Sequence, residues 1–111
     1  MIHIVTSRAT PQQIQEMLEE LGHYMKLAVD VRRRIIAGGG GMHADCEAAL
    51  LQNGSRQEDV WGANWYPEGQ EVEFESLINI RPRQGNRSML IADQKLRDTI
   101  AAIVRERCSA S

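Results

Sequence analysis

Alternation of apolar and polar residues is the clearest pattern in the chain, and it is strongest in the second half. Between Glu71 and Ile80, apolar residues alternate with glutamates, which is typical of a β-strand with one buried face. Two turn sequences precede this segment, Asn53-Gly54 and Pro67-Glu68-Gly69, whose residues tolerate or preset the backbone angles of tight turns. The pattern therefore predicts three antiparallel strands, at His43–Leu51, Arg56–Trp65 and Glu71–Ile80.

The turns also predict how these strands pair. Centring the second turn on Glu68-Gly69 places Asn64 opposite Glu73. Side chains alternate between the two faces of a strand, so each strand divides into an apolar and a polar set. The apolar face, which we expect to form the core, carries Ala44, Cys46, Ala48, Leu50, Trp61, Ala63, Val72, Phe74, Ile78 and Ile80. The polar face carries His43, Asp45, Glu47, Glu58, Asn64, Glu73, Glu75 and Asn79.

The flanking segments predict two helices and further strands. Thr10 has the position of a helix N-cap, with Pro11 in the first turn and Gln13 completing a capping box, and Gly22 is a suitable stop. Asp93 has the position of an N-cap for a final helix, which has an apolar stripe. Ile2–Val5 and Met25–Val31 have the composition of strands. We therefore expect an α+β fold, a mainly antiparallel sheet with two helices packed on one face.

Composition narrows the class of protein. The chain has 111 residues, which suits a single domain over residues 1–111, and its 42% hydrophobic and 25% charged content is ordinary for a globular protein. A net charge of −2 argues against a general nucleic-acid binder, which needs surplus Lys and Arg. No apolar run reaches the length of a membrane span, the N-terminus lacks a secretory pattern, and the two cysteines form no framework. We expect a cytoplasmic protein.

The best candidate for chemistry is the segment His43-x-Asp45-x-Glu47. On a strand, this spacing places an imidazole and two carboxylates on one face, with Asn64 and Glu73 beside them on neighbouring strands. Imidazole and carboxylate ligands suit a divalent cation such as Zn²⁺ or Mn²⁺, and crowded carboxylates also suit acid and base roles. The alternative is that these residues form the ordinary solvent face of an antiparallel sheet.

Two further segments have the composition of anion-binding sites. Arg81, Arg83 and Arg87 lie in one loop, and guanidinium groups suit carboxylate or phosphate ligands. The alternative is a solvated loop whose arginines pair with the glutamates of the last strand. The four glycines Gly38–Gly41 could form a backbone nest for an anion, but the pattern favours a flexible or wide turn between two strands, because glycine permits backbone conformations closed to other residues.

Several of these segments together carry a family resemblance. AGGG, HADCE, NGSRQEDVWGANW and NIRP followed by NRSM resemble a family of small uncharacterised bacterial proteins, a domain of unknown function. The resemblance extends over nearly the whole chain. It implies no particular reaction, cofactor or partner.

Two functional classes therefore remain open. The first is a site for a small anionic ligand or a divalent metal on the polar sheet face, formed by Asn64 and Glu73 with Arg81, Arg83 and Arg87, or by His43, Asp45 and Glu47. The second is a homo-oligomerising or partner-binding module without catalytic activity, because Leu77 opposite Val60 would form an apolar patch with a polar rim, suited to a homodimer. The sequence does not decide whether the protein is an enzyme.

Overall fold

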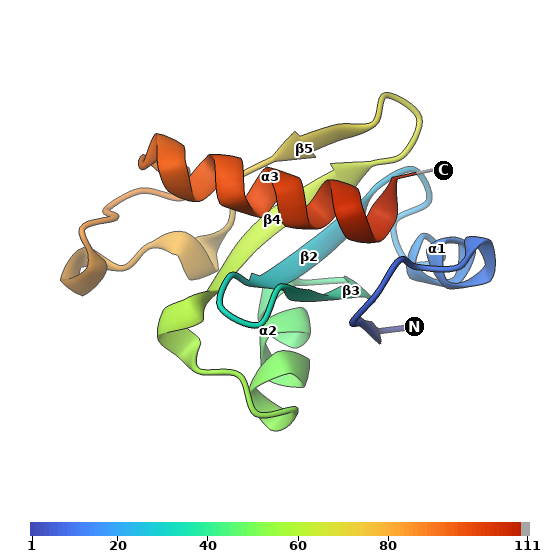
Figure 1. Cartoon of the computed structure of the whole chain (residues 1–111), viewed down its shortest axis with the longest axis horizontal. Helices are drawn as coiled ribbons and strands as arrows, with labels where there is room; N and C mark the ends of the chain where they lie inside the picture. The colour runs from blue at the N-terminus through green and yellow to red at the C-terminus, as the bar shows by residue number, and fades with distance from the viewer. Residues whose placement is uncertain (110–111) are drawn as a thin grey trace.

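A five-stranded antiparallel sheet forms the centre of the computed structural model, which describes residues 1–109 (Figure 1). In sheet order the strands are β1 (His3–Val5), β3 (Ile35–Gly40), β2 (Met25–Asp30), β4 (Val60–Tyr66) and β5 (Glu71–Glu73). The α-helices are α1 (Pro11–Met17), α2 (His43–Gln52) and α3 (Gln94–Cys108). Three short 3₁₀ helices lie between these elements: η1 (Gln57–Asp59) precedes β4, and η2 (Leu77–Asn79) and η3 (Pro82–Gln84) lie between β5 and α3. Within residues 1–109, no helix is both long and apolar enough to cross a membrane.

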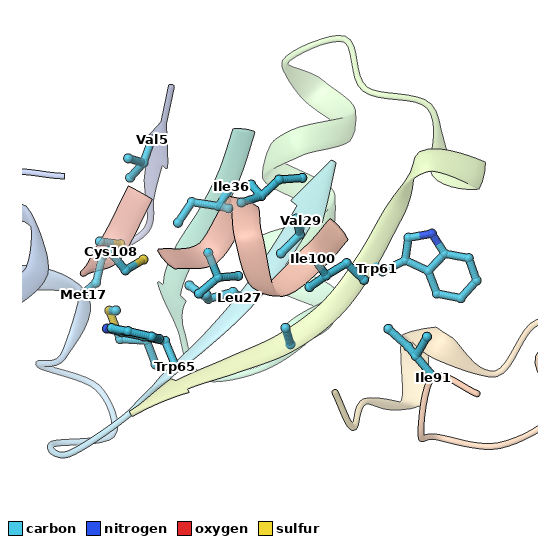
Figure 2. Close-up of a cluster of buried hydrophobic side chains, with 14 residues drawn as sticks. Val5, Met17, Leu27, Val29, Ile36, Trp61, Trp65, Ile91, Ile100 and Cys108 are labelled. Carbon is cyan, nitrogen blue, oxygen red and sulfur yellow. The ribbon is translucent and has the colours of Figure 1, made fainter. Parts of the chain in front are cut away.

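Helices cover both faces of the sheet. Met25, Leu27 and Val29 of β2 belong to one core cluster with residues of α1 and α3. Figure 2 shows Leu27 and Val29 of this cluster beside Ile100 of α3. The intervening Ala28 faces the other way and packs with residues of α2. The predicted α+β class with an antiparallel sheet is confirmed, but the prediction of two helices on one face is wrong. The reason is that a third helix, α2, buries the face that we expected to be open to solvent.

The prediction of a strand over His43–Leu51 is wrong, because this segment forms α2. Its residues HADCEAALLQ are rich in Ala and Leu, which favour helix. The buried residues Cys46 and Leu50 are four positions apart, which is the helical period and also fits an alternating pattern. Asn53-Gly54 is accordingly not a hairpin turn: Asn53 is the C-cap of α2, and Gly54 takes a positive φ of 104° just after it.

Other local predictions are confirmed. Thr10 and Gln13 form the full capping box of α1, and the Asp93 side chain caps α3 by accepting a hydrogen bond from the Lys95 amide. In the β4–β5 pair, Asn64 lies opposite Glu73, as the turn at Pro67 predicts. Trp61, Ala63 and Trp65 of β4 and Val72 of β5 also lie in the cluster that packs against α3.

The glycines of Gly38–Gly41 do not form a turn, because most of them belong to β3. Lys26 pairs with Gly40 and Leu27 pairs with Gly38, so Gly39 is the extra residue of a β-bulge. Its φ of 101° is a backbone conformation that residues other than glycine rarely adopt. The bulge directs the chain from β3 toward the start of α2.

After β5 the chain leaves the sheet, and two buried asparagines hold it in place. Asn79 accepts a hydrogen bond from the Gly62 amide at 2.8 Å and donates to the carbonyls of Gly62, Phe74 and Met89 at 3.0–3.2 Å. Asn86 in turn donates to the Asn79 carbonyl at 2.8 Å. The Asn79 side chain thus replaces a neighbouring strand beside Gly62, where β5 no longer pairs with β4.

This arrangement shortens the predicted strand Glu71–Ile80 to Glu71–Glu73. The Ser76 hydroxyl caps the 3₁₀ helix that follows, and Ser76 lies so close to β4 that a Cβ at Gly62 would be 2.5 Å from its Cβ. Leu77 therefore does not lie opposite Val60 in the sheet, because β5 ends at Glu73 and Leu77 begins the 3₁₀ helix η2.

We predict that Asn79→Ala lowers the free energy of unfolding by about 3 kcal/mol or more, because both backbone groups of Gly62 lose their partner inside the protein. Asn53→Ala, which removes an exposed asparagine, should change stability by no more than about 1 kcal/mol. Urea unfolding followed by circular dichroism measures both. Similar losses in the two variants would show that the Asn79 bonds do not hold the 74–92 segment.

Candidate functional site

A row of polar side chains crosses three neighbouring strands on the face that also carries α2. Lys26 of β2 lies opposite Asn64 of β4, and Asn64 lies opposite Glu73 of β5. Asn64 is only 8% exposed, so its amide requires hydrogen-bond partners. The row lies beside the first turn of α2, where the helix no longer covers the sheet.

His43, the first residue of α2, closes one side of this row. Its Nε2 atom lies 2.8 Å from Asn64 Oδ1 and 3.1 Å from the carbonyl oxygen of Ala63. A carbonyl oxygen only accepts hydrogen bonds, so Nε2 carries the proton and donates to it. Asn64 then donates from Nδ2 to Glu73 Oε1 at 3.5 Å. Both hydrogen bonds of His43 within residues 1–109 involve Nε2, so its Nδ1 atom keeps a lone pair that can accept a hydrogen bond.

Electrostatics favours the neutral form of His43. Partial burial lowers the pKa of the imidazole below 6.5, and the hydrogen bonds to Asn64 and Ala63 oppose this effect. The positive charge of Lys26 lowers the pKa of His43 further. At neutral pH the site therefore holds a neutral imidazole with a defined tautomer, which is suited to accept a hydrogen bond or a proton at Nδ1.

The row and His43 line a cavity of about 380 Å³, which is within the range of small-molecule sites. We call it the polar pocket. Apolar side chains from the start of α2 and from the segment held by Asn79 complete its wall. Its lining residues are Lys26, Met42, His43, Ala44, Asn64, Glu73, Glu75, Ser76, Leu77, Ile78 and Met89.

The structure does not place His43, Asp45 and Glu47 on one face. At 100° per residue along a helix, Asp45 points about 160° away from His43, and it is exposed. Glu47 lies one turn beyond His43 and forms an ion pair with Arg81 at 3.4 Å. The expected grouping rested on a strand and is wrong. Across the described part of the chain, no group of three or more His, Cys, Asp or Glu side chains is placed to hold a metal ion.

The Arg81 side chain bonds mainly to other groups of the protein. Its guanidinium lies 4.5 Å from the centre of the Trp61 ring and donates to the carbonyls of Gln57 and Ile78 at 2.7 and 2.9 Å, and also to that of Val60. Burial lowers the pKa of Arg81, and the nearby Glu47 carboxylate partly offsets this effect. Because its donors are occupied by the protein, little of this guanidinium is available to a ligand.

The other predicted arginines lie outside the polar pocket. Arg83 and Arg87 are exposed, and Arg83 lines a neighbouring groove of about 660 Å³, which shares Leu77 and Ile78 with the polar pocket. Of the predicted site residues, the structure therefore brings together His43, Asn64 and Glu73. It adds Lys26, which the sequence reasoning missed because it lies within an apolar strand segment. A lysine within MKLAV is the signal that could have identified it.

The fold and the pocket define the class: an α+β protein whose antiparallel sheet has helices on both faces and a polar pocket beside the start of one helix. The chain belongs to the family described as Protein of unknown function (DUF5674), whose model matches residues 3–107. Its expected membership of a family of unknown function is thereby confirmed. Neither the curated proteins nor the solved structures include a match to the chain.

The lowered pKa of His43 predicts a pH-dependent stability. The folded pKa lies below the unfolded value of 6.5, so the unfolded chain binds the proton more strongly. The stabilisation is complete above pH 6.5 and declines as the pH falls toward the folded pKa.

We expect the wild type to lose more unfolding free energy than His43→Gln between pH 7 and pH 5 in urea titrations. His23→Gln, which changes an exposed histidine, should behave as the wild type does. Equal pH dependence in wild type and His43→Gln would contradict a neutral, partly buried imidazole.

Proposed function

We propose that this protein binds a small polar ligand in the polar pocket. The observation that carries the proposal is the His43–Asn64–Glu73 chain of hydrogen bonds, which lines a cavity of small-molecule size together with Lys26. Holding partly buried polar groups in fixed orientations costs solvation free energy. In a binding site this cost is offset when a ligand bonds to the groups that the protein leaves available.

The available groups define what a ligand can contact. His43 Nδ1 accepts a hydrogen bond, and the Lys26 ammonium, which donates one bond to the Gly41 carbonyl at 3.2 Å, has further donors. An anionic group is therefore suited to the Lys26 side of the polar pocket. Met42, Leu77 and Met89 supply apolar contacts at its rim.

The proposal predicts that a panel of small polar molecules contains ligands that shift NMR signals of Asn64 and His43. Lys26→Met should weaken such binding about tenfold, because it removes a charge-assisted hydrogen bond. Lys95→Met is the matched control, since Lys95 is exposed on α3, and it should bind as the wild type does. A panel in which no member shifts these signals would contradict the proposal, as would ligands that Lys26→Met and Lys95→Met affect equally.

A second candidate function is self-association, and one observation favours it. Leu77 is 69% exposed and Ile80 is 44% exposed, and both line the neighbouring groove, which Glu58 and Arg83 also line. Exposed apolar side chains with a rim of both charges suit a two-fold interface, in which the same surface meets itself. In this function the protein is a homodimer or partner-binding module, and no catalysis is required.

If the groove is a dimer interface, sedimentation should show a wild-type dimer that Leu77→Glu dissociates without unfolding. Ile2→Glu, which changes an apolar residue near the opposite edge of the sheet, should leave the dimer intact. A wild-type monomer at every accessible concentration would rule out this second function. The same result would leave ligand binding in the polar pocket unaffected.

A further inference from the structure

The polar pocket contains charges of both signs that the protein does not pair. The ion pairs within residues 1–109 involve other side chains, and none includes Lys26, Glu73 or Glu75. Lys26 bonds a backbone carbonyl, and the partners of Glu73 are neutral: the Asn64 amide at 3.5 Å and the Tyr66 hydroxyl. One cation and two carboxylates thus line a single cavity without neutralising each other.

The geometry of the sheet keeps these charges apart. Lys26 is on β2 and Glu73 is on β5, with Asn64 of β4 between them. Two strand spacings separate their Cα atoms by about 10 Å. Between the two charges lies the neutral pair formed by His43 and Asn64. The polar pocket therefore has a positive side at β2, a neutral centre and a negative side at β5.

This separation discriminates between classes of ligand. A ligand that is only anionic would be attracted by Lys26 but repelled by the two carboxylates. A ligand that is only cationic would be attracted by the carboxylates but repelled by Lys26. A molecule with both charges satisfies each side, because every charge then has an opposite partner along one cavity, at the half-buried Lys26 and at the exposed carboxylates of Glu73 and Glu75. Apolar groups of Leu77, Ile78 and Met89 lie along the same cavity and suit a methylene chain.

We propose that the ligand of the polar pocket is a small zwitterion of the amino-acid type, with its carboxylate at Lys26 and its ammonium at Glu73 and Glu75. This inference rests on the proposed binding function. The carboxylate end lies near the N-terminus of α2, because Lys26 bonds Gly41 just before the helix begins, and the helix dipole adds to the attraction. The spacing of the charges favours a ligand with several methylenes between its charges over an α-amino acid.

The test compares four probes by NMR titration: γ-aminobutyrate, butyrate, n-butylamine and glycine. The first three share a carbon chain and differ in charge, and glycine keeps both charges but shortens their separation. We expect γ-aminobutyrate to bind about tenfold or more tightly than the other three, since each of them loses a charge contact or its correct spacing. The signals to follow are the Asn64 side-chain amide and the His43 ring.

Two variants test which residue binds the carboxylate end of the ligand and which binds its ammonium end. Lys26→Met and Glu73→Gln should each weaken γ-aminobutyrate binding about tenfold. Glu71→Gln is the matched control, because Glu71 lies on the same strand two positions away and does not line the polar pocket. It should leave the affinity unchanged.

The possible results separate this inference from the proposed function. Butyrate or butylamine binding as tightly as γ-aminobutyrate would overturn the zwitterion while leaving a ligand pocket. Binding of γ-aminobutyrate that neither Lys26→Met nor Glu73→Gln weakens would overturn it too. If none of the four probes binds, the zwitterion proposal is wrong, and the wider panel of polar molecules then decides whether the polar pocket binds any ligand.

Discussion

The hydrogen bonds between the Asn79 side chain and the backbone of Gly62 are the interaction on which the rest of this structure depends. β5 pairs with only the last three residues of β4, so the backbone of Gly62 needs another partner. Asn79 supplies both a donor and an acceptor there while it is fully buried. Buried backbone groups are costly to leave unpaired, so this side chain fixes the 74–92 segment against the sheet.

The polar pocket follows from that constraint. The segment that Asn79 holds provides one wall, through Ser76, Leu77 and Ile78, and the first turn of α2 provides the other. The floor is the row formed by Lys26 and Asn64 with Glu73. Because the walls exclude part of the solvent, His43 stays neutral and its hydrogen bonds hold one tautomer. Chain segments that are distant in sequence thus produce a site whose charges are separated by the spacing of the strands.

The parts of the fold that local chemistry determines could be predicted from the sequence. The capping box of Thr10, the Asp93 cap and the pairing of Asn64 with Glu73 each depend on residues close together in the chain. The segment that became α2 could not be assigned in the same way, because its buried positions fit both a strand and a helix. Packing on Ala28 and Val60 of the sheet decides between them.

The site was predictable in part for the same reason. Asn64 and Glu73 follow from strand pairing, whereas the position of His43 beside them depends on where α2 begins. Arg81 has the sequence context of an anion-binding residue, yet its donors bond backbone carbonyls and its guanidinium lies over Trp61. Those partners come from three separate segments, and only the folded chain brings them together.

The most direct measurement of the central claim is a crystallographic soak of the protein with a mixture of small polar and apolar fragments. The polar pocket and the neighbouring groove, which Ile80 and Arg83 line, then compete for ligands within one experiment. We expect polar fragments to be ordered in the polar pocket, with an acceptor near the Lys26 ammonium and a group bonded to His43 Nδ1. Fragments confined to the groove, with only water in the polar pocket, would contradict a ligand site at His43, Asn64 and Glu73.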